Sequence, residues 1–154
     1  MLWLVLGIVV LILLAVWLTW TAMRIDRLNA RVEGAWQSLD AQLVRRAMAL
    51  QETHAGFGDQ DVRAVTSRAL TAEDRPSRAE AENEVGAAIA GLPADAVGER
   101  LVIACTQVQT ARTFYNDAVR AYAALRSQRL PRLLRLDSAT DMPPYFDIDD
   151  SPGT

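Results

Sequence analysis

Residues that could carry chemistry are few in this chain. His54 is the only histidine and Cys105 the only cysteine, which is too few for a His/Cys metal cage or a Cys–His catalytic pair. We predict that His54 is a partly buried, hydrogen-bonded helix residue and that Cys105 is a small packing residue. The sequence also has no glycine-rich phosphate loop. We therefore assign no catalytic, cofactor-binding or metal-binding residue and expect neither an enzyme nor a small-molecule substrate.

Three aspartates near the C-terminus, Asp147, Asp149 and Asp150, offer carboxylate oxygens of the kind that calcium prefers. A calcium-binding loop also needs a glycine turn and a bidentate glutamate, and the tail lacks such a loop. We therefore expect no metal ion and no cofactor in this segment.

Two arginines stand at unusual positions on the predicted helices. Arg46 and Arg112 each fall about 40° from the centre of the apolar stripe of their helix. Because a buried charge needs a partner, we predict an inner polar layer that fixes the register of the helices. The alternative, in which both arginines extend outward to solvent, stays open. The residues predicted for the layer are Arg46, Arg112, Asp40 and Asn116, with Glu82 as a further partner.

The element that precedes all of these residues is an apolar segment. Residues 2–18 contain no polar side chain, and no charged residue precedes Arg24. About 22 helical residues span about 33 Å, close to the ~30 Å hydrocarbon core of a bilayer, and insertion is favourable by about 5 kcal/mol. We predict a transmembrane anchor at residues 1–23 and keep a cleaved signal peptide as the alternative. Tryptophans suited to a membrane interface stand near both ends, at Trp3, Trp17 and Trp20.

Basic residues follow this anchor directly. Because the arginine-rich flank of a span stays cytoplasmic, we predict the N-terminus outside and residues 24–154 in the cytoplasm. If the helices run up and down, the end of the last helix returns to the membrane, and a basic collar there contacts anionic lipid. The alternative is that the later arginines only complement a helix dipole. The predicted collar residues are Arg24, Arg27, Arg31, Arg126, Arg129, Arg132 and Arg135.

The rest of the chain predicts a helical bundle. Apolar residues recur at spacings of three and four, and no alternating β-branched segment occurs, which favours the all-α class. Gly56 and Gly58 end the first helix, and Ser77 with Glu80 forms a capping box for the third. We predict an antiparallel up-down bundle of four helices, two long and two short, over residues 24–130. The expected helices cover about residues 24–57, 60–74, 77–92 and 95–129.

The predicted C-terminal tail, residues 131–154, contains four prolines and five aspartates. We expect it to be extended and mobile, and docking of residues 144–146 stays open. Basic first and last helices flank an acidic middle, which charge balance between packed helices explains better than nucleic-acid binding. All sixteen basic residues are arginine, which we interpret as the codon usage of a GC-rich bacterial genome.

Three separated motifs resemble those of the LemA family. Residues 35–46, Ala-Trp-Gln-Ser-Leu-Asp-Ala-Gln-Leu-Val-Arg-Arg, resemble its opening pattern AW-x-x-(I/L)-D-x-Q-L-x-R-R. Residues 111–122 are similar to A-R-x-(F/Y)-Y-N-x-x-V-x-x-Y, and residues 144–147 to P-Y-F-(E/D). Residues 47–53 depart from the family's L-I-P-N-L-V segment, so the chain resembles a divergent member.

The resemblance implies a membrane-bound helical bundle, and it does not imply an enzyme, because the molecular activity of the family is poorly defined. We predict a non-catalytic interaction or scaffold role. The expected partners are the lipid bilayer and other membrane or cytoplasmic proteins, with no nucleic acid. The alternative is an accessory or regulator of a membrane protease in an envelope stress response.

Overall fold

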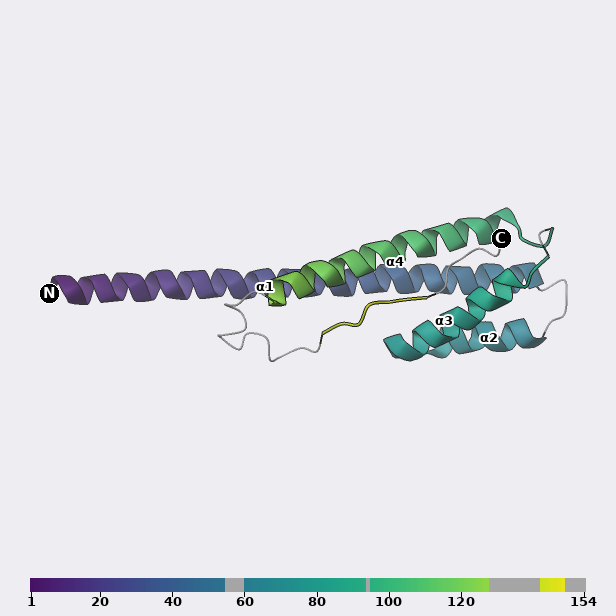
Figure 1. The fold of residues 1–154 in the computed structure, drawn as a ribbon, viewed down its shortest axis with the longest axis horizontal. Helices are drawn as coiled ribbons and strands as arrows, with labels where there is room; N and C mark the ends of the chain where they lie inside the picture. The colour runs from purple at the N-terminus through teal and green to yellow at the C-terminus, as the bar shows by residue number, and fades with distance from the viewer. Residues whose placement is uncertain (55–59, 94, 128–141, 149–154) are drawn as a thin grey trace. The chain divides into compact units, whose positions relative to one another are not determined.

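The computed structural model describes four segments of the chain, and over them it contains four helices and no strand. The predicted all-α class is therefore confirmed. The described segments are residues 1–54, 60–93, 95–127 and 142–148. The helices are α1 (Leu2–His54), α2 (Gln60–Thr71), α3 (Arg75–Ala90) and α4 (Glu99–Arg126) (Figure 1). The helix ends predicted at Phe57, with Gly56 and Gly58, and at Arg129 lie outside these residues.

The predicted anchor and the first predicted helix form one continuous helix, α1. It has 53 residues, which corresponds to about 80 Å at ~1.5 Å per residue. No proline occurs in it, so nothing removes a backbone donor along its length. Its N-terminal part is long and apolar enough to cross a membrane, and the most apolar window of the helix has none of its residues buried.

The chain divides into two compact units, to both of which α1 and α4 contribute. The first unit contains residues 1–33 and 118–143, and the second contains residues 34–117 and 144–154. In the first unit, the buried residues of α1 and α4 are Thr21, Val32, Ala118, Val119, Tyr122 and Leu125.

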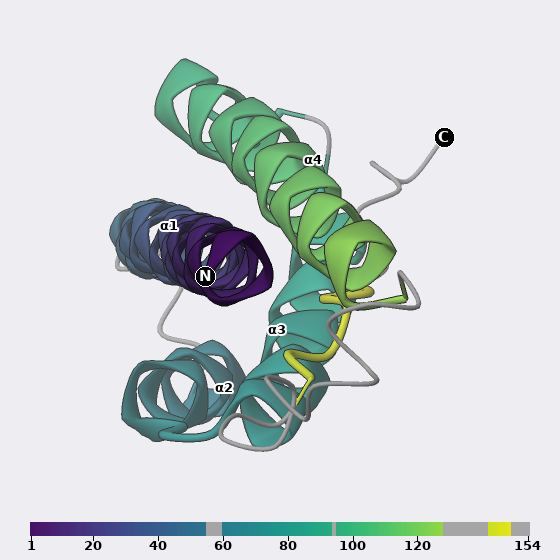
Figure 2. The same cartoon turned by 90° about the vertical axis from the view of Figure 1, so that its left-hand side faces the viewer.

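The second unit contains an antiparallel pair of helices and a helical hairpin. Arg100, near the start of α4, lies 3.3 Å from Glu52, near the end of α1, and the ring of Tyr115, further along α4, lies 5.5 Å from that of Trp36, earlier in α1. The two segments therefore run in opposite directions. α2 and α3 lie side by side (Figure 2). Their apolar faces meet those of α1 and α4 in one core, formed by Leu50, Val62, Ala69, Ala81, Val85 and Leu101.

The start of α3 differs from the prediction. Asp74 caps the helix, because its extended backbone (φ −98°, ψ 155°) lets the carboxylate accept a hydrogen bond from the amide of Ser77. The predicted capping box of Ser77 and Glu80 is therefore wrong. Pro76 lies inside the first turn, where a missing amide hydrogen removes no helical bond. The hydrogen bonds from the side chain and the backbone of Ser77 lower the pKa of the Asp74 carboxyl below its usual value.

Two other helices, α2 and α4, are shorter than predicted at one end. α2 ends at Thr71 and not at Asp74, and α4 begins at Glu99 and not at Asp95. A turn closed by the Ala96 amide and the Pro93 carbonyl (2.9 Å) precedes α4. Val97 therefore lies before the helix.

Candidate functional site

The second unit holds a connected set of charged side chains, three of them buried and the fourth, that of Asp40, 44% exposed; we call this set the inner ion layer. Arg46 of α1 is 2% exposed and Glu82 of α3 is 0% exposed. Arg46 NH2 donates to Glu82 Oε2 at 2.7 Å and to the Glu82 carbonyl at 3.2 Å. Glu82 Oε1 accepts a hydrogen bond from Arg78 Nε at 3.0 Å, and Arg78 NH2 lies 3.2 Å from Asp40 Oδ1. One buried carboxylate therefore serves two buried guanidinium groups and joins α1 to α3.

The inner ion layer has a structural consequence. Two positive and two negative side chains balance, so the layer carries no net charge. A buried charge that loses its partner is strongly destabilising, so a shift of α3 along α1 would separate Arg46 from Glu82 at high cost. The layer therefore favours one register of these two helices.

The structure brings some of the predicted polar residues into this layer and not others. Arg46 and Asp40 belong to it, through Glu82 and Arg78. Sequence reasoning missed Arg78, although it stands three residues before buried Ala81 on the same helical face. Arg112 and Asn116 instead bind main-chain groups of the C-terminal segment, residues 144–148, which need hydrogen-bond partners.

Asn116 and Arg112 hold the main chain of the C-terminal segment. The amide of Phe146 donates to Asn116 Oδ1 at 3.0 Å, and Asn116 Nδ2 donates to the Phe146 carbonyl at 3.0 Å. Arg112 NH1 donates to the Ile148 carbonyl at 3.0 Å and lies 3.5 Å from Asp147 Oδ1. These side chains of α4 therefore bind an extended backbone from another part of the chain.

Aromatic rings support the same segment. Phe146 is buried, and its ring centroid lies 5.4 Å from that of Trp36, with an interplanar angle of 64°. Tyr115 Oη donates to the Pro144 carbonyl at 2.8 Å and accepts from Arg75 NH1 at 3.3 Å. The Arg75 guanidinium lies 4.8 Å from the centroid of Trp36, a cation–π distance. α1, α3 and α4 each contribute one of these supporting side chains.

The described part of the C-terminal tail is docked, with some of its side chains buried. Phe146 and Ile148 are buried, whereas Tyr145 and Asp147 are exposed, the alternation of an extended strand. Residues 131–141 of the predicted mobile tail lie outside the described residues, as do Asp149 and Asp150. Within the described part of the chain, no group of three His, Cys, Asp or Glu residues could hold a metal ion.

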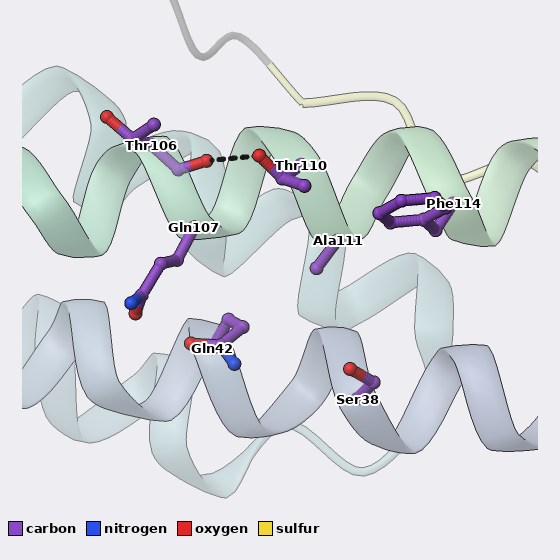
Figure 3. Close-up of a pocket in the computed structure, with 7 residues that line it drawn as sticks. All are labelled: Ser38, Gln42, Thr106, Gln107, Thr110, Ala111 and Phe114. Carbon is purple, nitrogen blue, oxygen red and sulfur yellow. Dashed lines mark hydrogen bonds between the residues drawn. The ribbon is translucent and has the colours of Figure 1, made fainter.

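A groove of about 290 Å³ lies between α1 and α4 in the second unit (Figure 3). Figure 3 shows Ser38 and Gln42 on α1 facing Gln107 and Ala111 on α4. Phe114 is 66% exposed at the end of this groove. The groove has no charged side chain in its lining, so it presents hydroxyl, amide and aromatic groups and no acid–base pair. Its lining residues are Ser38, Gln42, Thr106, Gln107, Thr110, Ala111 and Phe114.

The predicted collar residues fall in the first unit where the structure describes them. Arg24 and Arg27 line a groove of about 370 Å³ together with Leu28, Ala121, Ala124 and Leu125. Arg31 is exposed, and the Arg126 guanidinium lies 5.4 Å from the ring centroid of Tyr122. Arg24, Arg27 and the last turns of α4 are therefore neighbours within this unit. Arg129, Arg132 and Arg135 lie outside the described residues.

The single cysteine and the single histidine lie on two different helices, α4 and α1. Cys105 is half-buried and packs against the core of the second unit, as a packing residue does. His54 ends α1, and its side chain lies outside the described part of the chain. Comparison of the chain with models of protein families, with curated proteins and with solved structures finds no match.

Proposed function

We propose that this chain is a single-pass membrane protein of the LemA type, whose helical bundle binds other proteins and catalyses no reaction. In this proposal residues 1–23 are the anchor and residues 24–154 lie in the cytoplasm. The observation that carries the proposal is the apolar, exposed N-terminal part of α1.

Every side chain from residue 2 to residue 17 is exposed, and none is charged. Apolar surface in water costs roughly 25 cal/mol per Å², and a helix that is apolar on all sides is stable only inside a membrane or a large core. A bilayer removes this cost, whereas the described part of the first unit offers these residues no cover. The continuity of α1 into the bundle supports a retained anchor over a cleaved signal peptide.

The orientation rests on charge. Arg24, Arg27 and Arg31 follow the anchor, residues 1–23, within about two turns of helix. Arginine-rich flanks of a span stay cytoplasmic. The neighbouring end of α4 adds Arg126 to this flank. In the proposal, these residues face the anionic headgroups of the inner leaflet.

The interaction role rests on the stripe of α4 that borders the groove between α1 and α4. Ile103, Gln107, Thr110 and Phe114 follow one another at helical spacing, and all four are exposed. Phe114 is the largest of them and adjoins the uncharged groove between α1 and α4. An exposed stripe beside a shallow groove suits the packing of a partner helix.

A site-specific photo-crosslinker tests this role in native membranes. Placed at Phe114, it is expected to capture a specific set of proteins, identified by mass spectrometry. The matched control is a crosslinker at Ala87, which is exposed on α3. Identical adducts at both positions, or adducts of abundant bystanders alone, would contradict the interaction role, and capture of a membrane protease would favour the alternative role.

The orientation has its own test. In a Cys105→Ala background, a Thr113→Cys variant carries one exposed thiol on the bundle. We expect a membrane-impermeant maleimide to label this thiol only after the cells are permeabilised. Labelling in intact cells would place the bundle outside the cytoplasm.

A further inference from the structure

We propose that the surface holding residues 144–148 is a binding site for an extended segment of a partner protein, in which an aromatic residue is followed two positions later by an aliphatic residue. In the absence of that partner, the chain's own C-terminal segment occupies the site. This inference rests on the proposed function, because it names the partner chemistry of an interaction protein. We call the site the clip groove; it is formed by Trp36, Arg75, Arg112, Tyr115 and Asn116.

The clip groove recognises main-chain atoms. Asn116 makes two hydrogen bonds of 3.0 Å with the amide and the carbonyl of one residue, Phe146. This pair of bonds is what a neighbouring β-strand offers an extended residue. Tyr115 and Arg112 add bonds to two further carbonyls, at 2.8 Å and 3.0 Å. Since every peptide carries these groups, the groove can hold any extended segment whose side chains fit.

Two side chains of the bound segment provide the selection. Phe146 is 2% exposed and Ile148 is 4% exposed, whereas Tyr145 is 54% exposed. Peptide sites of this kind gain affinity from main-chain bonds and specificity from pockets for alternate side chains. The fitting ligand therefore has an aromatic residue followed, two positions later, by an aliphatic residue.

Charge gives a weaker preference. Arg112 lies 3.5 Å from the carboxylate of Asp147, and Arg75 lies over the Trp36 ring in the same groove. The Asp147 side chain is 97% exposed, and an exposed ion pair contributes little to affinity. An acidic ligand is therefore favoured in its approach to the groove, while the aromatic and aliphatic side chains decide whether it stays.

The chain's own segment competes with any partner. It follows α4 in the same polypeptide, and a short tether gives a bound segment an effective concentration on the order of millimolar. An external segment must displace it, so the wild-type chain binds such a segment weakly. Weakening the resident segment should expose the site.

The test uses the full chain in nanodiscs and a labelled synthetic peptide of residues 142–148, with binding followed by fluorescence anisotropy. Phe146→Ala in the chain weakens the resident segment and leaves every residue of the groove in place. We expect the peptide to bind this variant at least about tenfold more tightly than the wild type, because the tethered competitor is lost. Ile148→Ser is the second variant, in case the first loses its helical circular dichroism.

Controls separate specific binding from adhesion. Asn116→Ala, added to the Phe146→Ala chain, should weaken peptide binding at least about tenfold, because both main-chain bonds to one residue are lost. A peptide with Phe146→Ala should not bind, while a peptide with Tyr145→Ala should bind as well as the parent, since Tyr145 is exposed.

Three results would overturn the proposal. The first is no binding by a folded Phe146→Ala or Ile148→Ser chain, and the second is binding that ignores Asn116→Ala. The third is copurification of two differently tagged wild-type copies that Phe146→Ala abolishes, because a second copy would then fill the groove. None of these results changes membrane retention or crosslinking at Phe114, so failure here is distinguishable from failure of the proposed function.

Discussion

The two ends of α1 belong to one uninterrupted helix but differ in their surroundings. Residues 2–17 are apolar on all sides and exposed, whereas residues 34–54 are apolar along one stripe. In that stripe Leu39, Leu43 and Leu50 are fully buried, while Ala41 and Arg45 on the other faces are exposed. The difference shows that the distribution of apolar side chains, and not helix formation itself, decides which part of α1 the other described helices cover.

The two ends of α1 also differ in their content of charged side chains. The N-terminal part admits none, whereas the C-terminal part buries Arg46 against Glu82 at 2.7 Å. A protein interior can provide a matched partner at a fixed position, and a fluid hydrocarbon core cannot. The variants below test this comparison, in order of decreasing expected effect.

The largest effect is expected from charges in the N-terminal part. Val9→Arg with Leu13→Arg adds about 5–7 kcal/mol to the free energy of insertion, which offsets the predicted gain of about 5 kcal/mol. We expect the variant to leave the membrane pellet after an alkaline wash. The matched control, Gln37→Arg with Ala41→Arg, changes exposed positions of the same helix and should stay in the pellet. Equal retention of both variants would remove the distinction between the two ends.

The inner ion layer should give the next largest effect. Glu82→Gln removes the charge that two buried arginines share, and we expect the free energy of unfolding to fall by about 3–5 kcal/mol. Urea unfolding in detergent, followed by circular dichroism, measures this loss. Glu84→Gln breaks the Arg68–Glu84 pair, whose side chains are 59% and 41% exposed, and should cost less than about 1 kcal/mol. Similar losses in the two variants would mean that burial does not set the strength of the layer.

Loss of the two hydrogen bonds between Asn116 and the main chain of Phe146 should have a smaller effect. Asn116→Ala removes both hydrogen bonds to Phe146 and is expected to weaken docking of the segment by about 1–3 kcal/mol. Hydrogen exchange at the Phe146 amide should accelerate accordingly. Gln107→Ala, an exposed position on the same helix, should leave this rate unchanged. An unchanged rate in Asn116→Ala would show that the other contacts of the segment, including the bonds from Arg112 and Tyr115, hold it without Asn116.

The smallest effect should come from the α3 cap. The pKa of Asp74 is lowered from 3.8 in the folded chain, so its ionised form adds stability above that pH. This contribution is lost as the pH falls from 3.8 through the folded-state pKa. We therefore expect the difference in Tm between wild type and Asp74→Asn to shrink below pH 3.8. Ser77→Ala, which removes a donor to the carboxylate, should reduce this pH dependence; a difference in Tm that does not change with pH would contradict it.

The helices could be predicted from the sequence because burial repeats with the helical period. Leu39, Leu43, Ala47 and Leu50 fall on one predicted stripe, and all four are buried. The start of α3 could not be placed this way, since a first helical turn tolerates a proline such as Pro76 and periodicity does not show on which side of it the helix begins. There the hydrogen bonds of Asp74 decide the boundary, and these depend on backbone angles that periodicity does not contain.

The site was less predictable. The helical wheel places Arg46 toward the bundle. Arg78 stands three residues before Ala81, on the same face of the helix, and this spacing indicates that Arg78 is also buried. The pairing of Asn116 with Phe146 joins residues 30 positions apart through main-chain groups that every residue carries. No composition or spacing distinguishes such a pair, so docking of the C-terminal segment stayed open until the structure placed it.

Intact mass of the chain in alkaline-washed native membranes tests the central claim most directly. We expect the polypeptide to stay in the pellet and its mass to include residues 2–23. A soluble polypeptide that begins after this segment would contradict the account, because the exposed part of α1 would then be a leader and not an anchor.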